Sequence, residues 1–318
     1  MNVFLGIDVG SVSTNIAALD ESGKVRDTLY IRTQGRPIAA VQKGLRQIKE
    51  RNQDMIVKGV GATGSGRQLT GVVVGADTIK NEITAHAVAA MHIMPKVQTI
   101  IEIGGQDSKI IIIRNGVVTD FAMNTVCAAG TGSFLDQQAA RLNLPIEEFG
   151  NRAFESMTPV RVAGRCAVFA ESDMIHKQQT GHQIADILNG LCQALVRNYL
   201  NNVGKGKSIQ SPIVFQGGVA ANKGMKRAFE EALACEVIVP THYNVMGAIG
   251  SAVLAKEQIK NTARTAFRGF GMIDDAYTPR SFECDGCPNL CEVIELKIND
   301  QVAAMWGDRC GKWTGSVK

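Results

Sequence analysis

Two of the eight cysteines of this 318-residue chain stand directly before segments that are typical of helix starts. Cys127 lies in NTVCAAGTGSFLDQQAARLN (124–143), and Cys166 lies in GRCAVFAESDMIHKQ (164–178). The first turn of a helix carries unsatisfied N–H groups and a partial positive charge, which favour a thiolate or another negative ligand. Thiolates at two such positions suit an anionic iron–sulfur cluster, but a 4Fe–4S cluster normally takes four. A symmetric homodimer would supply four, with one cluster on its twofold axis.

Four further cysteines are gathered near the C-terminus, in FECDGCPNLCEVIEL and WGDRCGKW. Thiols at such C-x2-C-x3-C spacings, with a fourth downstream, indicate a tetrahedral four-cysteine site for zinc or a further iron–sulfur cluster. The spacing favours neither metal, and a metal-free loop is the alternative. The four residues are Cys284, Cys287, Cys291 and Cys310. Cys192 and Cys235 lie in apolar patterns and are expected to be core residues.

Three glycine-rich turns each follow an apolar strand pattern. FLGIDVGSVST places Asp8 at a strand end before Gly10, IIEIGGQDSK repeats the arrangement, and VFQGGVAANKGM opens a helix. A carboxylate at the end of a buried strand needs a positive or hydrogen-bonding partner, and hydrated Mg²⁺ is a suitable one. The backbone N–H groups of residues 10–13 can bind phosphate oxygens. Two such hairpins facing each other would hold a polyphosphate and its metal, while the third turn would approach adenine and ribose.

The elements that must position these turns follow one alternating pattern. Strands are expected over 3–10, 14–23, 24–35 and 55–66, with helices over 37–53 and 81–94. The pattern restarts near Pro95 with strands over 98–108, 109–116 and 117–124. Later come strands over 212–218 and 235–240 and helices over 221–234 and 244–258. Two similar strand-rich halves indicate an α/β fold with an internal duplication.

The composition excludes several classes of protein. Hydrophobic residues make up 45% and charged residues 20%, which is typical of globular domains, and a net charge of +4 without a dense basic run argues against nucleic-acid binding. No apolar stretch reaches about 18 residues, so no membrane span is expected. The N-terminal MNVFLGIDVGS lacks a basic region and a long apolar core, so we expect a strand and not a signal peptide. A cytoplasmic protein with metal-binding or redox cysteines is the expectation.

In this order, the three turns resemble those of the actin/Hsp70/sugar-kinase superfamily. The resemblance implies two RNase-H-like domains with ATP or ADP in the cleft between them. It implies that Asp8 and Asp107 organise Mg²⁺, through water, and the attacking water. Gln106 would position that water or bind a phosphate oxygen. The ATP contacts that it implies are Gly10, Ser11, Val12, Ser13, Thr14, Gly104, Gly105, Gly130, Thr131, Gly217, Gly218, Val219, Asn222 and Lys223.

Six segments narrow this resemblance: GIDVGSVST, NEITAHAVAA, IEIGGQDSK, NTVCAAGTGSFLD, GRCAVFAESDMI and GGVAANKGM. They look like the ATP-dependent activators of 2-hydroxyacyl-CoA dehydratases, the benzoyl-CoA reductase ATPase subunits and the reductases of double-cubane-cluster proteins, which are BadF/BadG/BcrA/BcrD-type ATPases. The match runs from residue 3 to about 256. It departs at Asn15, where many members have Lys, so Lys109 or Lys223 would have to compensate charge.

The family resemblance implies a homodimer with two ATP and one 4Fe–4S cluster held by Cys127 and Cys166 of each subunit. It also implies a ferredoxin or flavodoxin as electron donor and an iron–sulfur partner enzyme that receives one low-potential electron. ATP turnover would change the closure of the cleft and, with it, the cluster environment. The acceptor would reduce a CoA thioester or, as the cysteine-bearing tail slightly favours, a smaller molecule at a double-cubane centre.

The expected domains are 1–95, joined by 241–258, as the first RNase-H-like domain and 96–240, with the cluster cysteines, as the second. Residues 259–318 form a cysteine-rich C-terminal extension. Two other functions remain open at this point. A small-molecule kinase, such as a sugar kinase, would have no use for Cys127 and Cys166, and a chaperone-like reactivating ATPase would share the fold and bind a protein without a cluster.

Overall fold

The computed structural model describes residues 1–262 and 264–314, and it has the α/β architecture that the sequence predicts. Its contacts form two units, one of Met1–Glu82 with Gly247–Lys318 and one of Ile83–Met246. The predicted domain limits after residues 95, 240 and 258 stay predictions, and positions 263 and 315–318 of the predicted extension lie outside the described residues. Within the described part of the chain, no helix has the length and apolar character that crossing a membrane requires.

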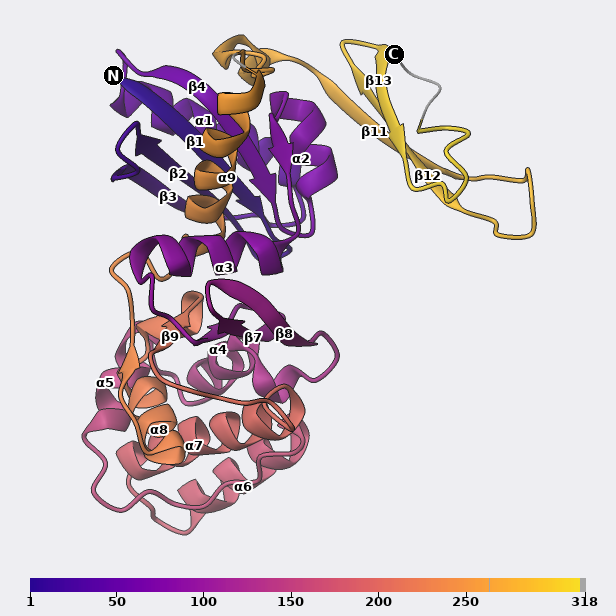
Figure 1. Ribbon diagram of the computed structural model, residues 1–318. Coiled ribbons are helices and arrows are strands. Elements are labelled where there is room, and N and C mark those ends of the chain that lie inside the picture. Colours follow the sequence, from indigo (N-terminus) through magenta and orange to yellow (C-terminus); the bar gives the residue numbers. More distant parts are fainter. Residues whose placement is uncertain (263, 315–318) are drawn as a thin grey trace. The chain divides into compact units, whose positions relative to one another are not determined.

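The first unit is built on a five-stranded sheet of order β3-β2-β1-β4-β5 (Figure 1). Helices α1 and α2 cover one face, where Leu5 and Ile7 pack with Val41 and Leu45. Helix α9 covers the other face, and a Cβ atom at Gly6 would lie 1.8 Å from the Ala248 carbonyl oxygen. The elements are β1 (Asn2–Val9), β2 (Ser13–Asp20), β3 (Val25–Arg32), α1 (Pro37–Arg51), β4 (Ile56–Thr63), α2 (Arg67–Val74), β5 (Thr78–Ile79) and α9 (Met246–Thr262).

The second unit has a five-stranded sheet of order β10-β9-β6-β7-β8. Its strands are β6 (Thr99–Ile103), β7 (Ser108–Arg114), β8 (Val117–Asn124), β9 (Ile213–Gln216) and β10 (Val237–Ile238). Its helices are α3 (Glu82–Ile93), η1 (Ala128–Gly130), α4 (Gly132–Arg141), α5 (Ile146–Phe154), α6 (Ala167–Gln179), α7 (Ile184–Asn202), η2 (Gly218–Ala221) and α8 (Lys223–Leu233). Buried rings join the sheet to α7 and α8, because Phe229 makes edge contacts with Tyr199 and Phe215 at centroid distances of 5.3 Å and 5.1 Å.

The two sheets share one topology. In each, the first strand pairs antiparallel with the second and parallel with a later strand, so β6, β7 and β9 take the places of β1, β2 and β4. The repeated sequence pattern predicts this arrangement. Each sheet therefore ends its first strand in a tight turn at the same structural position, which makes the two turns directly comparable.

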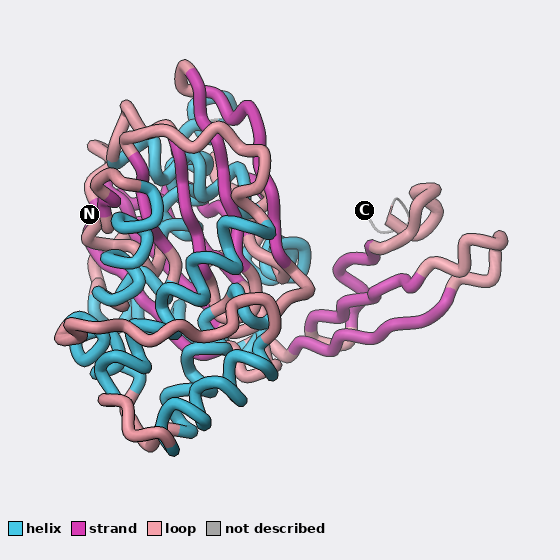
Figure 2. The backbone as a smooth tube through the Cα atoms, turned by 90° about the horizontal axis from the view of Figure 1, so that it is seen from below, coloured by secondary structure: helices cyan, strands magenta, loops and turns pink. Residues whose placement is uncertain are grey.

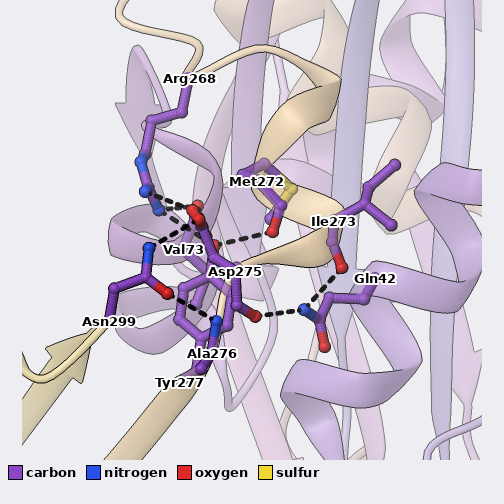
Figure 3. A network of polar contacts seen from close by, with 9 residues as sticks. All are labelled: Gln42, Val73, Arg268, Met272, Ile273, Asp275, Ala276, Tyr277 and Asn299. Atoms are coloured by element: carbon purple, nitrogen blue, oxygen red, sulfur yellow. Dashed lines mark hydrogen bonds and ion pairs between the residues drawn. The ribbon is translucent and has the colours of Figure 1, made fainter.

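The C-terminal extension forms η3 (Phe270–Asp274) and an antiparallel sheet of β11 (Tyr277–Glu283), β12 (Glu292–Ile298) and β13 (Gln301–Trp306), whose strands and loops Figure 2 distinguishes by colour. A polar network attaches it to α1 and α2 (Figure 3). The Gln42 amide donates to the carbonyls of Ile273 (2.9 Å) and Asp275 (3.1 Å). Arg268 donates to the Val73 carbonyl (3.0 Å) and to the Asp275 carboxylate (2.8 Å). The start of the extension is thus fixed to α1 and α2 by the side chains of Gln42 and Arg268.

Two features were not predicted from the sequence. Helix α2 has the sequence RQLTGVVV, in which glycine and four β-branched residues give no helical signal, yet its Val73 and Val74 are buried in the core. The three-stranded sheet of the extension was not predicted either. In α2, tertiary packing decided the structure over local preference.

Candidate functional site

The turn between β1 and β2 surrounds Asp8 with polar groups. Gly10 N–H donates to the Ser13 carbonyl at 2.9 Å, closing the turn. In register, Asp8 pairs with Asn15 on β2 and with Thr63 on β4. Gly64, with φ of +87°, follows Thr63, and a Cβ atom there would lie 2.5 Å from the Asp8 Oδ1 atom. Only glycine gives both this backbone conformation and this close approach to the carboxylate.

Two buried oxygen atoms beside Asp8 are available to a ligand. The Asn15 Oδ1 and Thr63 Oγ1 atoms make no hydrogen bond within residues 1–262 and 264–314, although the residues are only 7% and 0% exposed. Thr14 is satisfied, since its hydroxyl pairs with that of Thr33 at 3.0 Å. Unsatisfied buried oxygens cost free energy. Their position next to a carboxylate therefore fits a hydrated cation, whose waters would donate to them.

The turn between β6 and β7 repeats this geometry with a different charge pattern. Gly104 N–H donates to the Asp107 carbonyl at 3.0 Å, as Gly10 does in the first turn. In register, Glu102 pairs with Lys109, so these two residues occupy the places of Asp8 and Asn15. The Lys109 Nζ atom lies 3.0 Å from the Glu102 Oε2 atom and 2.9 Å from the Asp107 Oδ2 atom. Burial opposes the charge on Lys109, but the two carboxylates outweigh it and hold its pKa above the ordinary value.

Glu102 is a candidate site residue that the sequence analysis missed. It is 4% exposed and pairs in register with Gln216 on β9. The Gln216 Nε2 atom lies 2.9 Å from the Nδ1 atom of His86 on α3. Burial, and then the nearby charge of Lys109, lower the pKa of His86 to about 3, so this histidine is neutral at pH 7. Because the turn has four residues, counting back across it from Lys109 could have identified Glu102 as the facing residue on β6.

Backbone contacts gather three glycine-rich segments of the second unit. Gly132 N–H donates to the Gly104 carbonyl (2.9 Å), and Ser133 N–H donates to the Gly105 carbonyl (2.8 Å). Gly217, with φ of +88°, leaves no room for a side chain, since a Cβ atom would lie 2.4 Å from the Ile103 carbonyl oxygen. The predicted residues Gly104, Gly105, Gly130, Thr131, Gly217 and Val219 therefore belong to adjacent segments around the end of β6.

Other predicted contacts are placed differently. Asn222 caps α8, accepting from the Met225 N–H at 3.0 Å, and is only 9% exposed. Lys223 and Gln106 are exposed, and Asp107 is held beside Lys109. Ser11, Val12 and Ser13 form the exposed to half-buried turn of the first unit, and Gly218 borders open space. The roles assigned to these residues by the resemblance stay predictions.

Cys127 and Cys166 stand at helix starts, as their sequence positions indicate. Cys127 is the N-cap of η1 and Cys166 is the N-cap of α6, and both are half-buried. Asn124 holds the first segment from both sides, accepting from the Cys127 N–H and donating to its carbonyl, each at 2.9 Å. The Asn198 amide, on α7, lies 3.7 Å from the Cys127 sulfur and donates to the Gly164 carbonyl at 2.7 Å. Both cysteine segments therefore contact one helix.

Large apolar side chains next to these cysteines are exposed. Val126 is 94% exposed, and Val168 and Phe169, in the first turn of α6, are 69% and 67% exposed. Exposed apolar side chains such as these, one before Cys127 and two after Cys166, are ones that another protein chain could cover.

The C-terminal cysteines lie in two loops at one end of their sheet. Cys284, Cys287 and Cys291 lie between β11 and β12, while Cys310 follows β13, and the strand register brings both loops to the same end. Cys284 N–H donates to the Cys291 carbonyl at 2.9 Å. The Trp313 ring packs on Phe282 at 5.0 Å. Nowhere in residues 1–262 and 264–314 do three His, Cys, Asp or Glu side chains converge as a metal site.

Comparisons with known proteins add to this geometry. The profile of the BadF/BadG/BcrA/BcrD ATPase family matches residues 5–255. The (R)-2-hydroxyglutaryl-CoA dehydratase activating ATPase of Acidaminococcus fermentans is 35% identical over 259 residues, covering 79% of this chain and 96% of that protein. The activator of lactoyl-CoA dehydratase of Anaerotignum propionicum is 32% identical over 257 residues, covering 80% and 97%. The activator of the 2-hydroxyisocaproyl-CoA dehydratase from Clostridium difficile with bound ADPNP has a similar structure, with a TM-score of 0.73, 31% identity and coverage of 82% and 97%.

Proposed function

This chain belongs to the BadF/BadG/BcrA/BcrD ATPase family, and from that premise we propose that it is an ATP-dependent, low-potential one-electron donor to an iron–sulfur partner enzyme. The relatives named above activate dehydratases of 2-hydroxyacyl-CoA thioesters. The partner would be of that dehydratase type, of the benzoyl-CoA reductase type or of the double-cubane type. A cytosolic ferredoxin or flavodoxin would supply the electron.

One observation carries this proposal. Residues 127–133 connect Cys127 to the β6–β7 turn (residues 104–107), which we call the second phosphate turn. There the Gly132 and Ser133 N–H groups donate to the Gly104 and Gly105 carbonyls at 2.9 Å and 2.8 Å. A nucleotide that moves this turn must move the start of α4 and, through η1, Cys127. A sugar kinase has no need of a thiol at this place, so the contact favours coupling between the nucleotide and a thiolate-bound centre.

The nucleotide end of the coupling would use groups of both turns. Backbone N–H groups of residues 10–14 and 104–107 would bind phosphate oxygens. Asp8 would hold Mg²⁺ through water, and the buried Asn15 and Thr63 oxygens fit the waters of such an ion. Asp107, which lies beside Lys109, would complete the charge around the ion, and Gln106 would orient the attacking water.

The thiol end would hold one 4Fe–4S cluster per homodimer through Cys127 and Cys166 of both subunits. Two half-buried thiols per chain supply half of the donor set that such a cluster takes. When bound, the cluster would supply one-electron redox chemistry. The exposed Val126, Val168 and Phe169 flank the thiols, and a second copy of the chain would cover them.

We propose separately that the four cysteines of the extension form a thiolate site for zinc or a further iron–sulfur cluster. Their gathering at one end of the β11–β13 sheet supports it. A small three-stranded sheet also gains stability from a bound metal. Because the thiols do not converge as a metal site within the described residues, binding would have to draw the two loops together. Metal analysis should then show that the Cys284→Ser, Cys287→Ser double variant lacks metal that the unaltered protein retains.

Anaerobic purification tests the main proposal. We expect a brown protein with about four iron atoms per dimer in the bridging cluster. The iron is counted in the Cys284→Ser, Cys287→Ser double variant, so that metal bound by the extension does not contribute. Cys127→Ser and Cys166→Ser should each lose this iron while ATP binding remains. A colourless, iron-free protein would contradict the proposal. If that protein phosphorylates a small molecule, it is a kinase, and if it only binds a partner protein, it is a reactivating ATPase.

A further inference from the structure

Asn198, on α7, connects the two cysteine segments although it lies far from both in the sequence. We propose that Asn198 is a positioning residue that donates an N–H group to the Cys127 sulfur and fixes Cys127 relative to the Cys166 segment. This inference rests on the proposed function, because the thiolate concerned is the proposed cluster ligand.

The orientation of the Asn198 amide follows from its neighbours. Its Nδ2 atom lies 2.7 Å from the Gly164 carbonyl oxygen, and because a carbonyl only accepts, the atom facing it must be nitrogen. The Asn198 Oδ1 atom accepts from the Asn202 amide at 2.8 Å. The second N–H of Nδ2 is therefore free to face the Cys127 sulfur, which lies 3.7 Å away.

Packing keeps the amide in this place. Asn198 is only 4% exposed. A Cβ atom at Gly130 would lie 2.8 Å from the Asn198 Oδ1 atom and 2.9 Å from the Asn124 Nδ2 atom. Glycine at position 130 thus leaves the room in which both amides reach the Cys127 segment.

The next residue of α7 fixes the helix to the second phosphate turn. The buried Tyr199 hydroxyl donates to the Lys109 carbonyl at 2.7 Å, and the Lys109 side chain pairs with Glu102 and Asp107. One turn of α7 therefore contacts both the strand behind the phosphate turn and the thiol. The contact of Tyr199 also fixes the position of the neighbouring Asn198, so the Asn198 N–H group is preorganised toward the Cys127 sulfur.

A donor in this position has a defined chemical effect. A thiolate ligand gains negative charge when its cluster is reduced, and an N–H group directed at the sulfur stabilises that charge. Loss of the donor should therefore make the midpoint potential more negative. Loss of the link between Cys127 and Gly164 should also loosen the pair of thiols and speed iron release.

The test compares Asn198→Ala with Asn189→Ala in the anaerobic holoprotein, with Cys284 and Cys287 replaced by serine in both. Asn189 is a matched control, because it lies on the same helix and is 1% exposed, and its amide makes no hydrogen bond within the described chain. Asn198→Ala should give a more negative midpoint potential and about tenfold faster iron release to a chelator. Asn202→Ala, which removes the group that orients Asn198, should shift both quantities in the same direction by less.

A spectroscopic measurement separates this role from a purely structural one. The iron–sulfur stretching bands of the unaltered protein should shift on transfer to D₂O, and Asn198→Ala and the near-isosteric Asn198→Asp should both lose part of that shift. If iron is bound but potential, release rate and bands of the Asn198 variants match those of Asn189→Ala, the positioning role is wrong and the proposed function stands. If the unaltered protein binds no iron, both fall.

Discussion

The β1–β2 turn (residues 10–13) and the β6–β7 turn (residues 104–107) share one backbone geometry but differ in charge. Each is closed by an N–H to carbonyl bond, of 2.9 Å at Gly10 and 3.0 Å at Gly104. At equivalent register positions the first turn has Asp8 opposite Asn15, whereas the second has Glu102 opposite Lys109. The first leaves buried oxygens without a partner in the described chain, and the second fills the same positions with an ion pair.

This difference supports different roles for the two turns within the proposed function. The unsatisfied oxygens near Asp8 fit a ligand that is not part of the chain. In the second turn, Lys109 already compensates two carboxylates and is fixed by Tyr199. We infer that the first turn mainly binds the cation, while the second is a stiff connection from the phosphates to α7 and the thiols.

The largest expected effect comes from breaking the ion pair. Lys109→Met should lower the free energy of unfolding by about 3–5 kcal/mol, because it removes the cation that compensates the buried Glu102 charge. Asn15→Met, at the equivalent position, should cost about 1 kcal/mol or less, since no charge loses its partner. Chemical unfolding measures both. The Glu102→Gln, Lys109→Met double variant should recover most of the loss, and equal costs at the two positions would refute the assigned difference.

The carboxylates should differ in their effect on catalysis. Asp8→Asn should lower the rate of ATP hydrolysis about 10²-fold, as expected when a group that holds the metal is neutralised. Asp107→Asn should lower it about tenfold, because Lys109 already offsets the Asp107 charge. Steady-state ATPase assays over a range of Mg²⁺ concentrations compare the two. Asp120→Asn, on β8 and paired with Lys207, is the control and should hydrolyse ATP at the normal rate.

The smallest effect should appear as a dependence of stability on pH. The pKa of His86 is about 3 in the folded protein, against an ordinary value of 6.5, so the unfolded chain binds a proton that the folded one does not. The contribution of neutral His86 to the free energy of unfolding is therefore present above pH 6.5. It decreases as the pH falls, by about 2 kcal/mol between pH 7 and pH 5. His86→Gln should remove this part of the slope, and His92→Gln, at an exposed position of the same helix, should keep it. A slope unchanged in His86→Gln would contradict the buried neutral state.

Local sequence signals were sufficient for much of the architecture. Alternating strand and helix patterns with repeated Gly-rich turns predicted the α/β fold and its two similar sheets, and the family resemblance from residue 3 to about 256 is confirmed by the profile match over 5–255. Glu102 was within reach, because a turn of fixed length sets which residues face each other across it. Helix α2 was not, because RQLTGVVV forms a helix only where a core receives its valines.

The sequence by itself determined the chemistry available to this protein: two thiols at helix starts, two similar Gly-rich turns after apolar strands and a cysteine-rich tail, all given by residues adjacent along the chain. Only the tertiary structure decided which distant groups serve them. Asn198 and Tyr199 meet Cys127 and Lys109 across 71 and 90 positions of sequence, through the packing of α7 on the sheet. Nothing in the local sequence distinguishes Asn198 from the other asparagines of α7, because burial and hydrogen bonding at that distance depend on the whole fold.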